Sequence, residues 1–181
     1  GADFYNSSTN SGFIVGTTTY HGDASELTTS STEKTFNLGS KSIDFSGSSQ
    51  YITTSSINLD TSDYTMCFWF MADVNSVDQG MINMLSNGSD RLISFGWFYN
   101  NIYFRLTSHY QGSTYIPTGQ WTHVCGTRDY ISSQSVLNLF INSSKDANFP
   151  VTQNNPSGVM GNLNIGRWPY GGYDFNGKMS E

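Results

Sequence analysis

The chain alternates short apolar segments with polar turns, and this pattern limits the folds that it can form. No window of ten or more residues repeats its apolar side chains with the 3.6-residue period of a helix. Short segments rich in aromatic and β-branched residues recur instead, separated roughly every 8–12 residues by turns of Gly, Ser, Asn and Asp. Many short strands at this spacing predict an all-β protein, a sandwich or a jelly roll.

One predicted strand, residues 64–71, carries bulky side chains on both of its faces. Phe68 and Phe70 point one way, whereas Cys67 and Trp69 point the other way. This pattern predicts a central strand that is covered on both sides. The other predicted strands are residues 42–45, 50–53, 81–85, 92–98, 102–106, 121–127, 136–141 and 162–166.

The length of 181 residues suits one domain, but the pattern divides it into two parts. Residues 1–40 contain polar runs of Ser and Thr with few large apolar side chains. We interpret them as an irregular N-terminal arm that packs on, or leads into, a sandwich formed by residues 41–181. Disorder of the arm is the alternative.

The charge composition argues against two classes of partner. A net charge of −6 with no basic cluster argues against nucleic acid and against an anionic membrane surface. No apolar run approaches the roughly 20 residues needed to cross a bilayer, so we expect no membrane insertion. Glycosylation sequons begin at Asn6, Asn87 and Asn142, which fits an extracellular protein, although a chain rich in Asn, Ser and Thr contains some by chance.

Two cysteines stand in the middle of two predicted strands. Cys67 lies in residues 64–71, and Cys125 lies in residues 121–127. Spacing alone leaves two interpretations open. One is a bridge across a sheet in an oxidising compartment, and the other is two unpaired thiols that pack as small apolar side chains.

Six short motifs, in this order, resemble the laminin-G-like and pentraxin group of concanavalin A-like jelly rolls. The resemblance spans roughly residues 41–181. It implies a two-sheet antiparallel sandwich, and pentraxins join the two strands that match those of Cys67 and Cys125, so it also implies a disulfide between them. The motifs occupy residues 42–52, 62–70, 119–127, 137–142, 163–166 and 175–177.

The chain departs from the pentraxin pattern at the calcium site. Pentraxins hold calcium through a Glu-Gln-Asp run after the strand that matches residues 162–166, where this chain has Arg167, Trp168 and Pro169. That site is therefore not supported, and we expect no required cofactor. A calcium ion held by loop aspartates remains an alternative to ordinary solvated turns. The loop aspartates are Asp73, Asp78 and Asp90.

The resemblance also places the start of a final strand at the end of this chain. We therefore expect the sandwich to stop before that strand, which a longer protein or another chain would supply. This expectation makes the chain part of a larger protein or assembly.

Catalysis and metal binding are not expected from the inventory of side chains. Glycoside hydrolases need two carboxylates roughly 5–9 Å apart across a cleft, and none of the three glutamates lies in a well-formed central strand. His21, His109 and His123 share no metal-ligand spacing. We expect no enzyme, no catalytic residue and no metal site.

Aromatic residues in the glycine-rich segment 166–176 form the candidate ligand site. Rings stack on sugars while carboxylates and amides bind hydroxyl groups, and the alternative is that the rings pin the loop onto the sandwich. The candidate residues are Arg167, Trp168, Tyr170, Tyr173 and Asp174.

The function that these residues and the resemblance imply is that of a recognition or adhesion module. Its partner would be a glycan or glycoprotein, and its place would be extracellular, on a cell surface or on a virion. A structural or oligomerising module without a carbohydrate ligand is the alternative.

Overall fold

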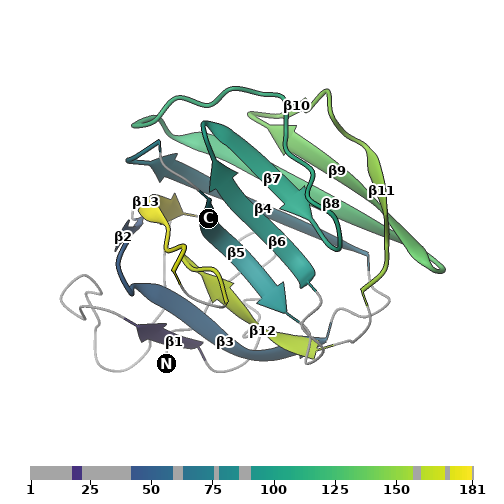
Figure 1. Ribbon diagram of the computed structural model, residues 1–181, viewed down its shortest axis with the longest axis horizontal. Helices are drawn as coiled ribbons and strands as arrows, with labels where there is room; N and C mark the ends of the chain where they lie inside the picture. Colours follow the sequence, from purple (N-terminus) through teal and green to yellow (C-terminus); the bar gives the residue numbers. More distant parts are fainter. Residues whose placement is uncertain are drawn as a thin grey trace, which may run out of the picture.

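The protein is a sandwich of two antiparallel β-sheets (Figure 1). The computed structural model describes residues 18–21, 42–58, 63–75, 78–85, 91–156, 160–169 and 172–180. Within these ranges every regular element is a strand. No helix long and apolar enough to cross a membrane occurs among them. The predicted two-sheet antiparallel sandwich is confirmed.

The first sheet has six strands, each antiparallel to its neighbours. Its core strands carry buried apolar side chains on the face that meets the second sheet. In order across the sheet the strands are β1 (Thr18–His21), β3 (Tyr51–Asn58), β12 (Met160–Ile165), β5 (Gln79–Leu85), β6 (Arg91–Phe98) and β7 (Asn101–Arg105).

The second sheet has seven strands, and β8 and β4 form its centre. A short strand, β11 (Val151–Asn154), pairs with β9. The remaining strands, in order across the sheet, are β10 (Ser144–Lys145), β9 (Gln134–Ile141), β8 (Thr122–Ile131), β4 (Tyr64–Ala72), β13 (Asn176–Ser180) and β2 (Ile43–Ser46).

The sequence pattern did not predict β1, β10, β11 or β13, and of these β13 lies deepest within a sheet. It lies between β4 and β2 and pairs with both. Gly177, at its second position, has a φ of 150°, and a Cβ atom there would lie 2.1 Å from the carbonyl oxygen of Met71. Only glycine fits this contact, yet glycine is depleted in strands, so its presence hid the strand from a pattern search.

Strand β1 lies within the predicted N-terminal arm and pairs with β3, at the edge of the first sheet. The rest of that arm, residues 1–17 and 22–40, lies outside the described residues.

Aromatic side chains fill the space between the sheets. Phe68 of β4 meets Phe95 of β6 edge to face, with ring centroids 5.4 Å apart, and Phe95 stacks on Phe104 of β7 at 4.3 Å. A Cβ atom on Gly126 of β8 would lie 2.3 Å from the Phe95 ring, so glycine makes room for this stack. Because interiors are close-packed, these rings fix the distance between the sheets and hold the loops at the sandwich ends.

The expectation that residues 64–71 would be covered on both faces is wrong. Strand β4 is central in its sheet, and Phe68 and Phe70 are buried on its inner face. On the outer face, Cys67 is exposed and Trp69 is 41% exposed. A two-layer sandwich covers only one face of each sheet, so bulky outward side chains pack on one another instead. Trp69 does so against His123 of β8, with ring centroids 5.0 Å apart.

Candidate ligand-binding site

Three connections meet at one end of the sandwich and surround a small pocket. They are the β2–β3 turn, the β4–β5 connection and the β12–β13 connection. The pocket has a volume of about 190 Å³, and both polar and apolar groups line its walls. Its lining residues are Gly47, Val74, Asp78, Gln79, Gly172, Tyr173, Asp174 and Asn176.

The backbone around Tyr173 is held by strand β5 and by its own connection. The N–H of Gly80 donates a 2.8 Å hydrogen bond to the carbonyl oxygen of Tyr173. On the far side, the N–H of Phe175 donates to the carbonyl oxygen of Gly166 at 2.9 Å, and the Phe175 ring is buried in the core. The chain therefore presents the side chains of Tyr173 and Asp174 from a fixed position.

Gly80 also explains how the β12–β13 connection can lie so close to β5. A Cβ atom at this position would lie 2.4 Å from the backbone nitrogen of Trp168. Any side chain here would push the connection away from the strand. The side chain of Asn83 holds the same segment, because its Nδ2 donates a 3.3 Å hydrogen bond to the carbonyl oxygen of Arg167.

Asp174 ties the three parts of the rim together. Its Oδ2 accepts a 2.6 Å hydrogen bond from the backbone N–H of Ser49, in the β2–β3 turn. Its Oδ1 lies 3.3 Å from Nε of Arg167, and the Asp174 side chain is only 11% exposed. The guanidinium of Arg167 lies 4.5 Å above the ring centroid of Tyr51. Both oxygens of Asp174 and the charge of Arg167 are thus committed to holding the rim.

Tyr173 is the aromatic residue that the pocket presents to solvent. Its side chain is 46% exposed, whereas most aromatic rings of the sandwich are buried. An exposed ring on a fixed backbone offers a flat apolar surface at little entropic cost. Val74 is the other apolar side chain on the pocket wall.

Asp78 brings a second carboxylate to the pocket. Its Oδ1 is buried, and the phenol of Tyr103 lies close to the carboxylate. The pKa of Tyr103 is raised above its usual range by burial and by the nearby Asp78 carboxylate, so the phenol stays protonated. Because the protonated phenol of Tyr103 lies beside Asp78, it is a hydrogen-bond donor within reach of this carboxylate.

The rim of the pocket is braced by the side chain of Gln79, at the start of β5. Its Oε1 accepts a 3.0 Å hydrogen bond from the N–H of Asn176. The carbonyl oxygen of Asn176 accepts a 3.0 Å bond from the N–H of Asp73, across the β4–β5 connection. The start of β13 is therefore fixed on both of its sides.

The structure places only some of the five predicted site residues at the pocket. Tyr173 and Asp174 line the pocket, and Arg167 supports it through Asp174. Trp168 is only 8% exposed, and the guanidinium of Arg105 lies 4.9 Å from its ring centroid. This burial favours the alternative in which Trp168 pins the connection onto the sandwich. Tyr170 lies outside the described residues.

Sequence reasoning missed the pocket residues of the β4–β5 connection as a ligand site. In the sequence Asp78 is a candidate calcium ligand or an ordinary solvated turn residue, and no local signal marks Val74 of that connection, Gln79 of β5 or Asn176 of β13. Among the described residues, no carboxylate belongs to a group of three or more acidic, histidine or cysteine side chains that could hold a metal ion. The carboxylate of Asp73 lies 3.9 Å from Nζ of Lys178 instead. Asp90 lies outside the described residues.

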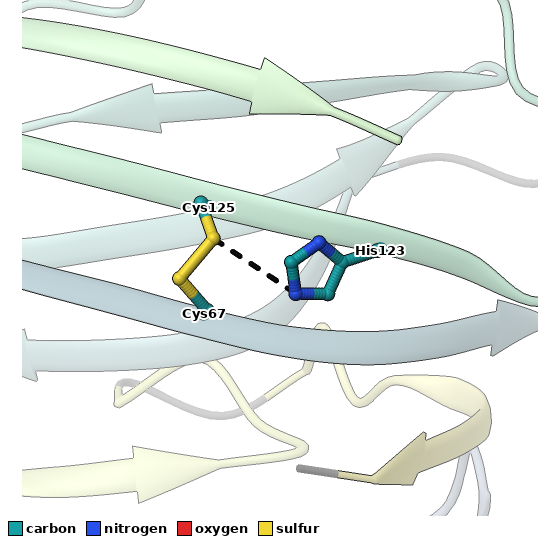
Figure 2. Close-up of a disulfide and its surroundings, with 3 residues drawn as sticks. All are labelled: Cys67, His123 and Cys125. Atoms are coloured by element: carbon teal, nitrogen blue, oxygen red, sulfur yellow. Dashed lines mark hydrogen bonds between the residues drawn. A yellow bond between two sulfur atoms is a disulfide. The ribbon is translucent and has the colours of Figure 1, made fainter. Parts of the chain in front are cut away.

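Cys67 and Cys125 form a disulfide, as the pentraxin resemblance implies (Figure 2). They are direct partners in the register of β4 and β8, and their Cα atoms are 4.1 Å apart. The bridge lies on the outer face of the second sheet, beside His123.

Comparisons with known proteins agree with this architecture. A family model described as the concanavalin A-like lectin/glucanases superfamily matches residues 46–181. A comparison with curated protein sequences gave no significant match.

Three solved structures illustrate the likeness of fold, all at low identity. Domain 4 of AbnA, an extracellular arabinanase from Geobacillus stearothermophilus, has a TM-score of 0.61 and 20% identity, over 98% of this chain and 84% of that one. An SAP-like pentraxin from Limulus polyphemus has a TM-score of 0.58 and 15% identity, over 76% and 72%. A putative carbohydrate binding protein from Bacteroides ovatus has a TM-score of 0.52 and 17% identity, over 76% of this chain and 41% of that one.

The match to the family model covers every residue that lines the pocket, both cysteines and the whole β12–β13 connection. Together with the two antiparallel sheets, this match settles the family. The chain belongs to the concanavalin A-like lectin/glucanases superfamily.

Proposed function

We propose that this domain is a non-catalytic recognition module that binds a neutral glycan in the pocket beside Tyr173. The observation that carries the proposal is the exposed ring of Tyr173 in a pocket that also contains the carboxylate of Asp78, while Asp174 holds the rim. Aromatic rings stack on the apolar faces of sugars, and carboxylates accept hydrogen bonds from sugar hydroxyl groups. The fixed backbone on both sides of Tyr173 would present these groups without reorganisation.

The charge of the pocket selects between neutral and acidic glycans. Two carboxylates line it, and the nearby cation, Arg167, already lies against Asp174. The chain as a whole carries a net charge of −6. Like charges brought together disfavour binding, so sialylated, sulfated or uronic-acid glycans would be rejected.

The comparisons support a carbohydrate ligand. The Bacteroides ovatus protein is described as a putative carbohydrate binding protein, and the arabinanase domain was solved in complex with arabinotriose, a neutral sugar. This chain spans 41% of the former, so the ligand of that protein is transferred here only as a class. We propose a glycan or a glycoprotein as the partner.

Cleavage of the glycan is not part of this proposal, although enzymes occur among the structural neighbours. Two carboxylates in one pocket resemble the arrangement that a glycosidase needs. Asp174, however, uses Oδ2 to hold Ser49 and Oδ1 to face Arg167. A carboxylate committed in this way is poorly placed to act as an acid, base or nucleophile. Glycan binding in this pocket would also need no metal ion, since side chains can bind sugar hydroxyl groups directly.

The proposed location is extracellular, on a cell surface or a virion, where the disulfide is maintained. A structural or oligomerising module is the second candidate function. The observation that favours it is the outer face of the second sheet, where Trp69 is 41% exposed and Trp121, just before β8, is 42% exposed. Exposed aromatic side chains of this kind also occur where proteins associate.

A glycan array that includes neutral and acidic sugars, read beside sedimentation velocity, tests the proposal. We expect binding to a subset of neutral glycans, no binding to the acidic ones, and the same result in the presence of a chelator. An array with no bound glycan, together with concentration-dependent association, would replace the proposal with the oligomerising module.

A further inference from the structure

The cluster around the disulfide brings together three donors that suit a soft metal ion (Figure 2). Nε2 of His123 lies 3.9 Å from Sγ of Cys125, and the ligand atoms of Cys67, His123 and Cys125 all lie within 4.8 Å of one another. We propose that, once the disulfide is reduced, these three residues form a binding site for a thiophilic cation such as Zn²⁺. In the oxidised protein the two sulfurs are bonded to each other, so the site exists only in the reduced state.

One of the donor distances, that between Cys125 and His123, is already close to that of a zinc site. With Zn–S bonds of about 2.3 Å and Zn–N bonds of about 2.0–2.1 Å, tetrahedral ligands lie about 3.8 Å apart for two sulfurs and about 3.6 Å apart for sulfur and nitrogen. The observed distance of 3.9 Å between Cys125 Sγ and His123 Nε2 needs a shift of only a few tenths of an ångström. The sulfurs separate when the bond breaks, and each Cys side chain can rotate about its Cα–Cβ bond.

His123 is held in place independently of the disulfide. Its backbone N–H donates a 3.0 Å hydrogen bond to Oδ1 of Asn142, and its carbonyl oxygen accepts a 2.8 Å bond from the N–H of Asn142. Its ring packs against Trp69, with centroids 5.0 Å apart. Restraints on a ligand's orientation are what a metal site requires of the residues around it.

The cluster is also accessible to reductant and to metal. It lies on the outer face of the second sheet, where Cys67 is exposed and His123 and Cys125 are half-buried. Three protein ligands leave a fourth position for water, as in open zinc sites. Two thiolates and one neutral imidazole would balance the charge of Zn²⁺.

A dithiol can act as the reductant of the disulfide. The dithiol passes two electrons and two hydrogens to the bridge, which becomes two thiols, and the reductant becomes a cyclic disulfide. Binding of Zn²⁺ then releases the two thiol protons to solvent, because thiolate is the ligand.

The test uses a phosphine as the reductant, because it does not compete for the metal as thiols do. The phosphine becomes its oxide with oxygen from water, and the two hydrogens of that water protonate the sulfurs. Co²⁺ is then titrated anaerobically, and thiolate-to-cobalt charge-transfer absorption reports the ligands. We expect one Co²⁺ per reduced chain, displaced by Zn²⁺, and none on the oxidised chain.

The His123→Ala variant tests the third ligand. We expect it to bind Co²⁺ at least about tenfold more weakly, since even outer-shell changes at metal sites cost that much. The matched control is His109→Ala, which removes a histidine that packs against Tyr103 instead. The melting temperatures of the two oxidised variants show that both are folded, and the control should keep the wild-type affinity.

Near-ultraviolet circular dichroism and the melting temperature of the reduced protein show whether the site belongs to the folded state. We expect a native-like spectrum, and a melting temperature that Zn²⁺ raises, because a ligand that binds the folded state stabilises it. Failure of the folded, reduced protein to bind cobalt would overturn the proposal. Equal affinity in His123→Ala would also do so, as would a reduced chain that stays unfolded with Zn²⁺ present.

Discussion

The backbone N–H of Ser49 donates a 2.6 Å hydrogen bond to Oδ2 of Asp174, which lies 125 positions later in the chain. This bond joins the β2–β3 turn to the β12–β13 connection, at opposite ends of the sandwich sequence. The other oxygen of Asp174 faces Arg167, which itself lies over Tyr51. One carboxylate thus fixes the rim of the pocket, and Tyr173, the next residue back, takes its position from it.

Trp168 should prove to be a packing residue and not a ligand contact. Its ring is buried against Arg105, so Trp168→Ala should lower the free energy of unfolding by about 3–5 kcal/mol, the usual cost of emptying a buried aromatic site. Chemical denaturation measures this loss. Tyr115→Ala, at a residue that is 70% exposed, is the control and should change stability by less than about 0.5 kcal/mol. A fully stable Trp168→Ala protein that no longer binds glycan would restore Trp168 as the stacking residue.

Asp146 should make stability depend on pH at the acidic end. Burial alone would raise its pKa, but hydrogen bonds from Ser113, Thr114 and Asn148 outweigh burial and lower it. A lowered pKa in the folded state means that the carboxylate stabilises the fold above its unfolded pKa of about 4. That contribution is lost as the pH falls from about 4 through the lower, folded-state pKa.

The variant Asp146→Asn isolates this effect. At pH 7 it should lose about 2–3 kcal/mol, since hydrogen bonds to a charged acceptor are replaced by bonds to an amide. The difference from the wild type should shrink in denaturation experiments below about pH 4, where Asp146 itself becomes neutral. A difference that stays constant from pH 7 to pH 3 would show that charge plays no part.

The disulfide should contribute much of the stability of the fold. It closes a loop with a sequence separation of 58 residues, which is worth about 4 kcal/mol in the chain-entropy model. The double variant Cys67→Ala and Cys125→Ala should lose about that amount in urea denaturation. Thiol titration of the denatured, unreduced wild type is the direct check, and two free thiols there would contradict the bridge.

The sequence could predict the fold because the residue types of most strands identify them as strands. Aromatic and β-branched residues mark β4 and β8, and their cysteines proved to be direct cross-strand partners. Strand β13 escaped prediction because its critical residue, Gly177, is chosen for the absence of a side chain beside Met71. The exposure of the outer face of β4 was not predicted either. Hydrophobic side chains on a strand face look the same in the sequence whether another layer covers that face or its aromatic residues only pack on each other.

The site was predictable only in part, for a different physical reason. Tyr173 and Asp174 lie in a glycine-rich segment that local composition marks as a loop. Asp78 and Val74 join them only because the β4–β5 connection folds back to the same end of the sandwich. Whether Trp168 turns outward or inward depends on Arg105, some 60 residues away, and on the close approach of the backbone to Gly80. Such long-range contacts leave no trace in a local pattern.

The proposal that this domain is non-catalytic can be tested on polysaccharides. We expect no release of reducing ends from neutral glucans, arabinans or alginate, because Asp174 is committed to Ser49 and Arg167. The measurement is a reducing-sugar assay at high protein concentration, with the variant Asp78→Asn as the control for any trace activity. Turnover that disappears in Asp78→Asn would make the protein an enzyme and Asp78 a catalytic residue.

Isothermal titration calorimetry with the best neutral glycan from the array tests the central claim most directly, on the wild type, Tyr173→Ala and Tyr115→Ala. Tyr115 is the control because it is exposed but does not line the pocket. We predict that Tyr173→Ala binds at least about tenfold more weakly, equivalent to about 1.4 kcal/mol, while its melting temperature stays that of the wild type. Tyr115→Ala should keep the wild-type affinity. Undiminished binding by a folded Tyr173→Ala protein would contradict the account and place the glycan elsewhere on the sandwich.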